Sequence, residues 1–140
     1  MTNARVDSER LRAAAVEIGR GGGLRLVVLF GSVARGQAGT RDLDIGVLGG
    51  GAGPLDAIAI TNRLIRLLGV QGVDVTDLGR ADPVLLAHAA RDGVPLYEGS
   101  AGEFAWFASL AIRRFADTRK FRVSEREAIR DYVAREPKPR

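Results

Sequence analysis

Residues 29–36 read Leu-Phe-Gly-Ser-Val-Ala-Arg-Gly, and residues 42–45 read Asp-Leu-Asp-Ile. The first stretch closes a short apolar run, Leu24–Phe30, which predicts a buried strand that ends in a glycine–serine turn and opens into a short helix. The second stretch alternates acidic and apolar residues, as expected at the start of a half-exposed strand over 42–48. We expect the rest of the fold to be arranged around these two strands.

The surrounding pattern alternates helices with strands. Outside the two strands already described, the expected elements are a helix over 7–19, a helix that starts at Pro54 and ends near Leu68, a strand over 73–78, a helix from Asp82-Pro83 to Gly93 and a short strand over 94–97. The sequence therefore predicts an α+β domain with a mixed β-sheet flanked by helices. We expect residues 1–100 to form its core.

The region 101–136 is expected to be helical and to pack on that core as part of a single domain. Apolar residues recur there at helical spacing, namely Phe104, Phe107, Ala108, Ala111 and Phe115. The aromatic residues of this helix, Trp106 included, are expected to lie mostly in the core. Apolar surface left over on this helix would be the best candidate for a partner interface. Ser124 and Glu127 match a capping box, which predicts that a last helix starts there.

Composition excludes several classes of function. The 140 residues include no cysteine and one histidine, so disulfides, thiolate catalysis and cysteine–zinc sites are excluded. No apolar run approaches the roughly 20 residues that span a bilayer, and we expect a cytoplasmic protein with no membrane association. The net charge of +4 comes mostly from arginines at helical spacing, which are typical of solvated helix faces, so stable nucleic-acid binding is not expected.

Asp42 and Asp44 are candidate metal ligands. Residues two apart on a strand point to the same face, about 6.6 Å apart, while Leu43 and Ile45 point the other way. Two carboxylates on one face repel each other unless a cation lies between them, and hard oxygen ligands suit Mg²⁺. The alternative is a solvated edge strand.

Asp74 is the third candidate ligand. It lies between Val73 and Val75, and it would join the same site if its strand lay beside that of Asp44; the alternative is a buried ion pair. Asp77 falls on the opposite face and is interpreted as a turn residue, and His88 as a packing or surface residue.

Gly31 and Ser32 are candidates for phosphate binding. A strand that turns into a helix at Gly-Ser leaves backbone N–H groups unpaired, Gly31 permits close approach, and the Ser32 hydroxyl can donate to a phosphate oxygen. Arg35 is either a further phosphate contact or an exposed side chain. A phosphate cradle beside metal-binding carboxylates is typical of nucleotidyl transfer, in which two metal ions hold the attacking and leaving oxygens.

The pattern of an apolar residue with Gly-Ser, nine further residues, Asp-x-Asp and a later strand Asp resembles the polymerase β-type nucleotidyltransferase superfamily. Size and layout resemble its minimal nucleotidyltransferases (MNT), the antitoxins of HEPN/MNT toxin–antitoxin modules. The resemblance implies that Asp42 and Asp44 hold two Mg²⁺ ions, and that Asp74 completes the metal site and helps to deprotonate the acceptor. Gly31 and Ser32 would seat the triphosphate of ATP.

The resemblance further implies an adenylyltransferase that transfers AMP from ATP to a tyrosine of a HEPN-domain toxin, its partner in a complex. One departure is Arg41, where the family commonly has serine before the first Asp; strand alternation is expected to point it away from the metals. About forty residues follow the sheet, too few for a second substrate domain, so we expect a partner chain to complete the acceptor site.

Two alternatives remain open. The same carboxylates would serve a small-molecule nucleotidyltransferase, such as one that modifies an aminoglycoside. The chain could also be a non-catalytic antitoxin that acts by binding alone. An Asp42→Ala/Asp44→Ala double substitution separates binding from catalysis, because only an enzyme should lose its ability to neutralise the toxin.

Overall fold

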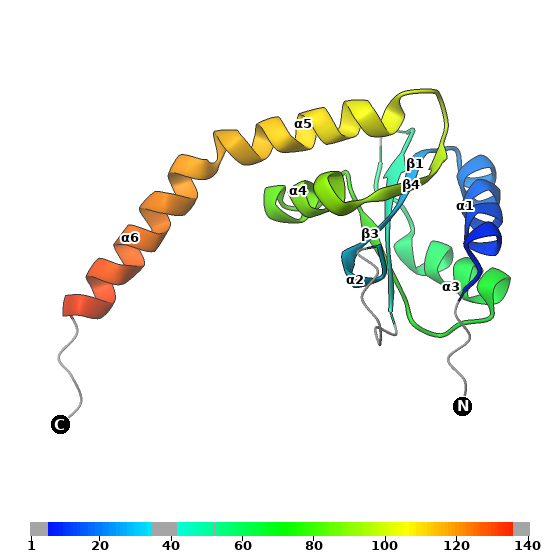
Figure 1. Ribbon diagram of the computed structural model, residues 1–140, viewed down its shortest axis with the longest axis horizontal. Helices are drawn as coiled ribbons and strands as arrows, with labels where there is room; N and C mark the ends of the chain where they lie inside the picture. Colours follow the sequence, from blue (N-terminus) through cyan, green and yellow to red (C-terminus); the bar gives the residue numbers. More distant parts are fainter. Residues whose placement is uncertain (1–5, 35–41, 52, 136–140) are drawn as a thin grey trace.

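The structure is a computed structural model in which residues 6–34, 42–51 and 53–135 are described. In chain order the elements are α1 (Ser8–Gly22), β1 (Leu24–Phe30), α2 (Gly31–Ala34), β2 (Leu43–Gly49), α3 (Ala57–Leu68), β3 (Val73–Asp77), α4 (Pro83–Asp92), β4 (Val94–Glu98), α5 (Glu103–Asp117) and α6 (Arg119–Arg135). Figure 1 shows a sheet with helices packed around it, and the chain from α5 into α6 extends away from this body to one side. The predicted α+β class is confirmed.

The sheet has the strand order β3-β2-β1-β4 and is mixed. The central strand β1 pairs antiparallel with both β2 and β4, whereas β2 and β3 are parallel. Successive side chains of β1 enter two different cores, because neighbouring residues of a strand point to opposite faces. Val27 and Leu29 pack with α1 and α3, while Val28 and Phe30 pack with α4 and α5.

Three helices begin at an aspartate that caps the first turn. Asp7, Asp56 and Asp82 each accept a hydrogen bond from a backbone N–H of the helix that follows. The expectation that Pro54 starts the third helix is therefore wrong by a few residues, because the Asp56 carboxylate provides a cap that proline cannot. The Asp82-Pro83 start is confirmed, with the proline in the first turn.

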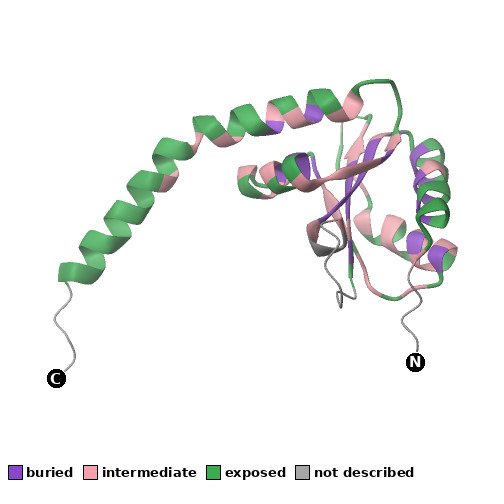
Figure 2. Ribbon diagram, viewed as in Figure 1, coloured by how far each residue is buried: buried purple, intermediate pink, exposed green. Residues whose placement is uncertain are grey.

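The C-terminal helices differ from the expectation in three ways. α5 packs on the core through Phe107 and Ala111, but Trp106 is 54% exposed, so its placement in the core was wrong. α6 starts at Arg119, and Ser124 lies inside it rather than at its cap. None of the residues of α6 is buried, so the expected packing of this helix on the core is absent (Figure 2).

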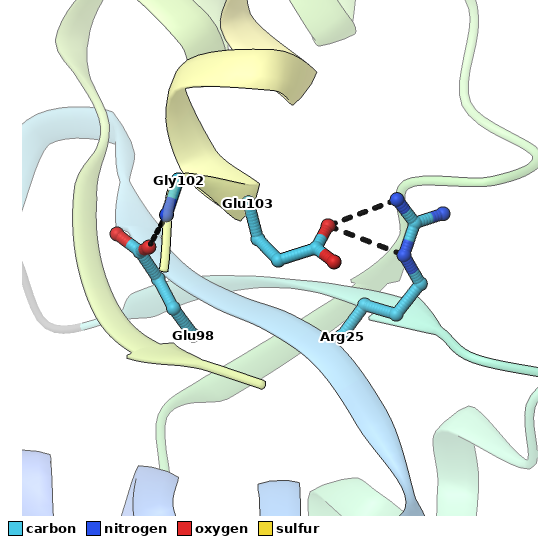
Figure 3. A network of polar contacts seen from close by, with 4 residues as sticks. All are labelled: Arg25, Glu98, Gly102 and Glu103. Atoms are coloured by element: carbon cyan, nitrogen blue, oxygen red, sulfur yellow. Dashed lines mark hydrogen bonds and ion pairs between the residues drawn. The ribbon is translucent and has the colours of Figure 1, made fainter. Parts of the chain in front are cut away.

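An ion pair joins the start of α5 to the central strand. Glu103 Oε2 accepts hydrogen bonds from Arg25 Nη2 at 2.9 Å and from Nε at 3.2 Å, and the Arg25 guanidinium also lies 5.3 Å from the ring centroid of Trp106. Glu98 Oε2 accepts from the Gly102 N–H at 3.0 Å (Figure 3). These contacts fix where α5 leaves the sheet. Among the described helices, none combines the length and the apolar character needed to cross a membrane.

Candidate active site

Asp44 and Asp74 are partners in the sheet. They occupy the same register position on the parallel strands β2 and β3. Side chains in register on adjacent strands share a face, and the strands are about 4.8 Å apart. Leu43 and Ile45 enter the core beneath α1 and α3, so Asp44 and Asp74 face the opposite side, where α4 and α5 lie.

Gly31 holds the turn directly against the Asp44 carboxylate. Its φ is +77°, a conformation that favours glycine, and a Cβ there would overlap Asp44 Oδ2 and lie 3.1 Å from Asp44 Cγ. Phe30, the residue before it, is the register partner of Asp44 across β1 and β2. The end of β1 and the starts of β2 and β3 thus bring Gly31, Asp44 and Asp74 to one place.

The other predicted site residues are less closely defined. Asp42 is exposed and directly precedes β2, rather than lying within the strand as expected. Ser32 lies in the backbone of α2, but its side chain is outside the described part of the structure, as are Arg35 and Arg41. Within the described ranges, no three or more His, Cys, Asp or Glu residues form a group that could hold a metal ion.

The donor set nevertheless fits a magnesium ion. Two carboxylates at one register position repel each other, and a divalent cation would offset that repulsion. Magnesium typically takes one or two protein carboxylates and fills its remaining positions with water and substrate phosphate, so it does not need three preassembled acids. Asp44 and Asp74 meet that requirement, and Asp42 lies two residues along the chain from Asp44.

Asp77 and His88 lie apart from the paired carboxylates. Asp77 Oδ1 accepts a hydrogen bond from the Gly79 N–H at 2.9 Å and so closes the turn after β3. His88 is exposed on α4, with its Nδ1 3.3 Å from Arg91 Nη2. Both agree with their interpretation as a turn residue and a surface residue.

A cleft of about 690 Å³ begins at the same glycine, and sequence reasoning missed it. Its lining includes Phe30, Gly31, Leu85, His88, Phe121 and Arg122. The cleft lies between the end of β1, α4 and the bend between α5 and α6. The only sequence signal was Phe121, an aromatic residue outside the apolar pattern of α5, because the cleft depends on where α6 is directed.

Comparison with known proteins agrees with this geometry. Residues 20–101 match the sequence model of the family described as polymerase beta nucleotidyltransferase. No curated protein sequence matches the chain. A solved toxin–antitoxin complex with AMP-PNP is 27% identical, with a TM-score of 0.69 over 88% of this chain and 98% of that one.

Two further solved structures show the same likeness. One is the structure of a tri-AMPylated Shewanella oneidensis HEPN toxin in complex with MNT antitoxin. The matching chain of that structure is 28% identical to this chain, with a TM-score of 0.67 over 91% of this chain and 99% of that one. The toxin–antitoxin complex MntA-HepT is also 28% identical over the same shares, with a TM-score of 0.66. The likeness therefore extends beyond the matched family segment into the C-terminal helices.

Proposed function

Because the chain belongs to the polymerase beta nucleotidyltransferase family, we propose that it is the antitoxin of a toxin–antitoxin pair and transfers AMP from ATP to a tyrosine of a HEPN-domain toxin. The tyrosine oxygen bonds to the α-phosphorus of ATP, the bond from that phosphorus to the bridging oxygen breaks, and pyrophosphate leaves. Similar complexes with AMP-PNP and with an AMPylated toxin support the donor and the acceptor. Since ATP is the donor, the cytoplasm is the expected compartment.

The three aspartates have distinct tasks in this proposal. Asp44 and Asp74, together with Asp42, hold Mg²⁺, which when bound supplies positive charge beside the reacting phosphate. Asp74 also accepts the proton of the tyrosine hydroxyl. Its exposed position on β3 leaves it open to a hydroxyl group that arrives on another chain.

The nucleotide binds on the side of Asp44 where Gly31 lies, away from Asp74. Gly31 lets a phosphate approach the backbone, and Ser32 and Arg35 are assigned to the triphosphate. We assign the nucleoside to the adjoining cleft, whose volume of about 690 Å³ is typical of small-molecule sites. Its walls include Phe30, Leu85 and Phe121, which suit the flat apolar faces of adenine.

The observation that carries the proposal is the register pairing of Asp44 with Asp74 beside Gly31. The test is to establish whether a HEPN reading frame adjoins the gene of this chain, and then to analyse its product by mass spectrometry after incubation with the chain, ATP and Mg²⁺. Wild-type protein should add AMP to a tyrosine. Asp74→Asn should slow the addition by at least about a hundredfold, because a proton acceptor and metal ligand is lost.

Asp77→Asn is the matched control on the same strand. Asparagine retains an oxygen that can accept the Gly79 hydrogen bond, and Asp77 faces away from Asp74, so the rate of AMP addition should stay close to wild type. Absence of any adduct with wild-type protein would overturn the catalytic proposal. If the chain still neutralised the toxin in that case, it would be a binding antitoxin, whereas turnover of a small acceptor would identify a small-molecule enzyme.

A further inference from the structure

Helix α6 is exposed along almost its whole length. It has 17 residues, none of them buried, and would be about 26 Å long at 1.5 Å per residue. Apolar residues lie along one face: Phe121 is 75% exposed, Ile129 56% and Val133 66%. Helices in proteins gain most of their stability by packing an apolar face against another surface, so the exposed apolar face of α6 calls for a partner.

The bend between α5 and α6 is nevertheless well held. The Arg122 guanidinium lies 3.7 Å from the ring centroid of Phe115, and its Nη2 donates to the Phe115 carbonyl at 3.0 Å. Arg122 Nη1 also donates to the Thr118 hydroxyl, and that hydroxyl donates to the Phe115 carbonyl. These contacts set the direction of α6 although the helix does not pack on the core (Figure 1).

The charge of α6 indicates what kind of surface it binds. The helix carries six basic and three acidic side chains, a net charge of +3. A second copy of the chain packed helix against helix would bring two positively charged surfaces together, which opposes association. A surface with aspartate and glutamate around an apolar centre would complement both the positive charge and the apolar face of α6.

We propose that α6 is the arm on which the toxin docks, through a helical face that carries apolar residues flanked by acidic ones. The identity of this partner rests on the proposed function. Phe121 and Arg122, in the first turn of α6, line the cleft that begins at Gly31. A toxin held on α6 is therefore bound beside the catalytic end of the sheet, where its tyrosine can be presented to Asp74.

The test uses an Ile129→Ser/Val133→Ser double variant, which changes the docking face away from the cleft. Calorimetric titration with the HEPN-domain toxin should show an affinity reduced by at least about tenfold. Far-ultraviolet circular dichroism and the affinity for ATP should be unchanged. The affinity of the wild-type chain for the toxin should also fall at high salt, because salt screens the charges that flank the apolar face.

Ile58→Ser is the matched control. Ile58 is 76% exposed on α3, on the opposite face of the sheet, so its substitution removes a more exposed apolar side chain than either Ile129 or Val133 without touching α6. Its toxin affinity should stay within about twofold of wild type. Toxin binding by the double variant at wild-type affinity would overturn the docking proposal.

The docking proposal and the catalytic proposal fail in different ways. Concentration-dependent dimerisation of the chain alone, abolished by the double variant, would assign the face to a second copy and also overturn the docking proposal. If wild-type protein binds the toxin but adds no AMP, only the catalytic proposal fails, and a weakened double variant still supports docking. If AMP is added and the double variant binds normally, only docking fails.

Discussion

At residue 31 the backbone has a φ of +77°, and a Cβ there would overlap the carboxylate of Asp44. We expect Gly31→Ala to displace that carboxylate and to reduce AMP transfer by at least about a hundredfold, since small displacements of catalytic groups are costly. The left-handed backbone should also lower the free energy of unfolding by about 1–2 kcal/mol. Transfer rates and urea unfolding measure the two effects separately.

Gly23→Ala provides the control for backbone strain. Its φ is +62°, and no atom lies within 4 Å of the position that a Cβ would take. This variant should lose a similar free energy of unfolding while AMP transfer stays near the wild-type rate. If both variants lost transfer equally, the contact between Gly31 and Asp44 would not matter for catalysis.

The pairing of Asp44 with Asp74 leads to a prediction about stability rather than rate. Without metal, Asp74→Asn should raise the free energy of unfolding by about 0.5 kcal/mol, because it removes one of two like charges at the same register position. With Mg²⁺ at ten times its dissociation constant, wild-type protein should gain about 1.4 kcal/mol. Asp74→Asn should gain much less, as measured by thermal melts with EDTA and with Mg²⁺.

An equal magnesium response in both proteins would contradict metal binding at Asp74. Asp77→Asn serves again as the control, and it should keep the wild-type response.

The juxtaposition of Gly31, Asp44 and Asp74 could be expected from sequence because strand periodicity is local. A two-residue alternation assigns Asp44 to the face opposite Leu43, and adjacent parallel strands then align Asp74 with it. The position of Asp42 was harder to predict, since it lies just outside β2 where no strand partner constrains it. The cleft could not be predicted, because it depends on the direction of α6, which is set by contacts at Thr118 and Phe115.

At the scale of elements, strands were predicted better than helix ends. β1 is a short apolar run that ends at Gly31, so both its type and its length followed from composition. The start of α6 was missed because the Ser124–Glu127 pattern also occurs inside helices. No glycine or proline separates α5 from α6, and the break at Thr118 is held instead by hydrogen bonds of the Arg122 side chain to Thr118 and Phe115, which no turn residue signals.

The attachment of α5 to the sheet can be tested through its ion pair. Glu103→Gln should lower the free energy of unfolding by about 1 kcal/mol, because Arg25 loses a charged acceptor that is only 17% exposed. Glu17→Gln is the control: its pair with Arg63 is longer, at 3.4 Å, and more exposed, so the change should be close to zero. Equal effects in urea unfolding would mean that Arg25 and Glu103 do not attach α5.

At the scale of the whole molecule, the core ends before the chain does. Both hydrophobic clusters are complete by Ala111, and every residue from 119 to 135 is exposed or half-buried (Figure 2). The molecule thus consists of a body with a hydrophobic core, from α1 to α5, and an arm formed by α6. Such a division predicts that stability and partner binding depend on different parts of the chain.

A chain that ends at Thr118 tests this division. It loses α6, in which no side chain is buried, so its melting temperature should fall by no more than about 5 °C, while its affinity for the toxin should fall below detection. A chain that ends at Gly102 also loses Phe107 and Ala111 from the core and should not fold cooperatively. If the chain that ends at Thr118 also failed to fold, α6 would stabilise the body of the protein, and its exposed face would be needed for folding before any partner is bound.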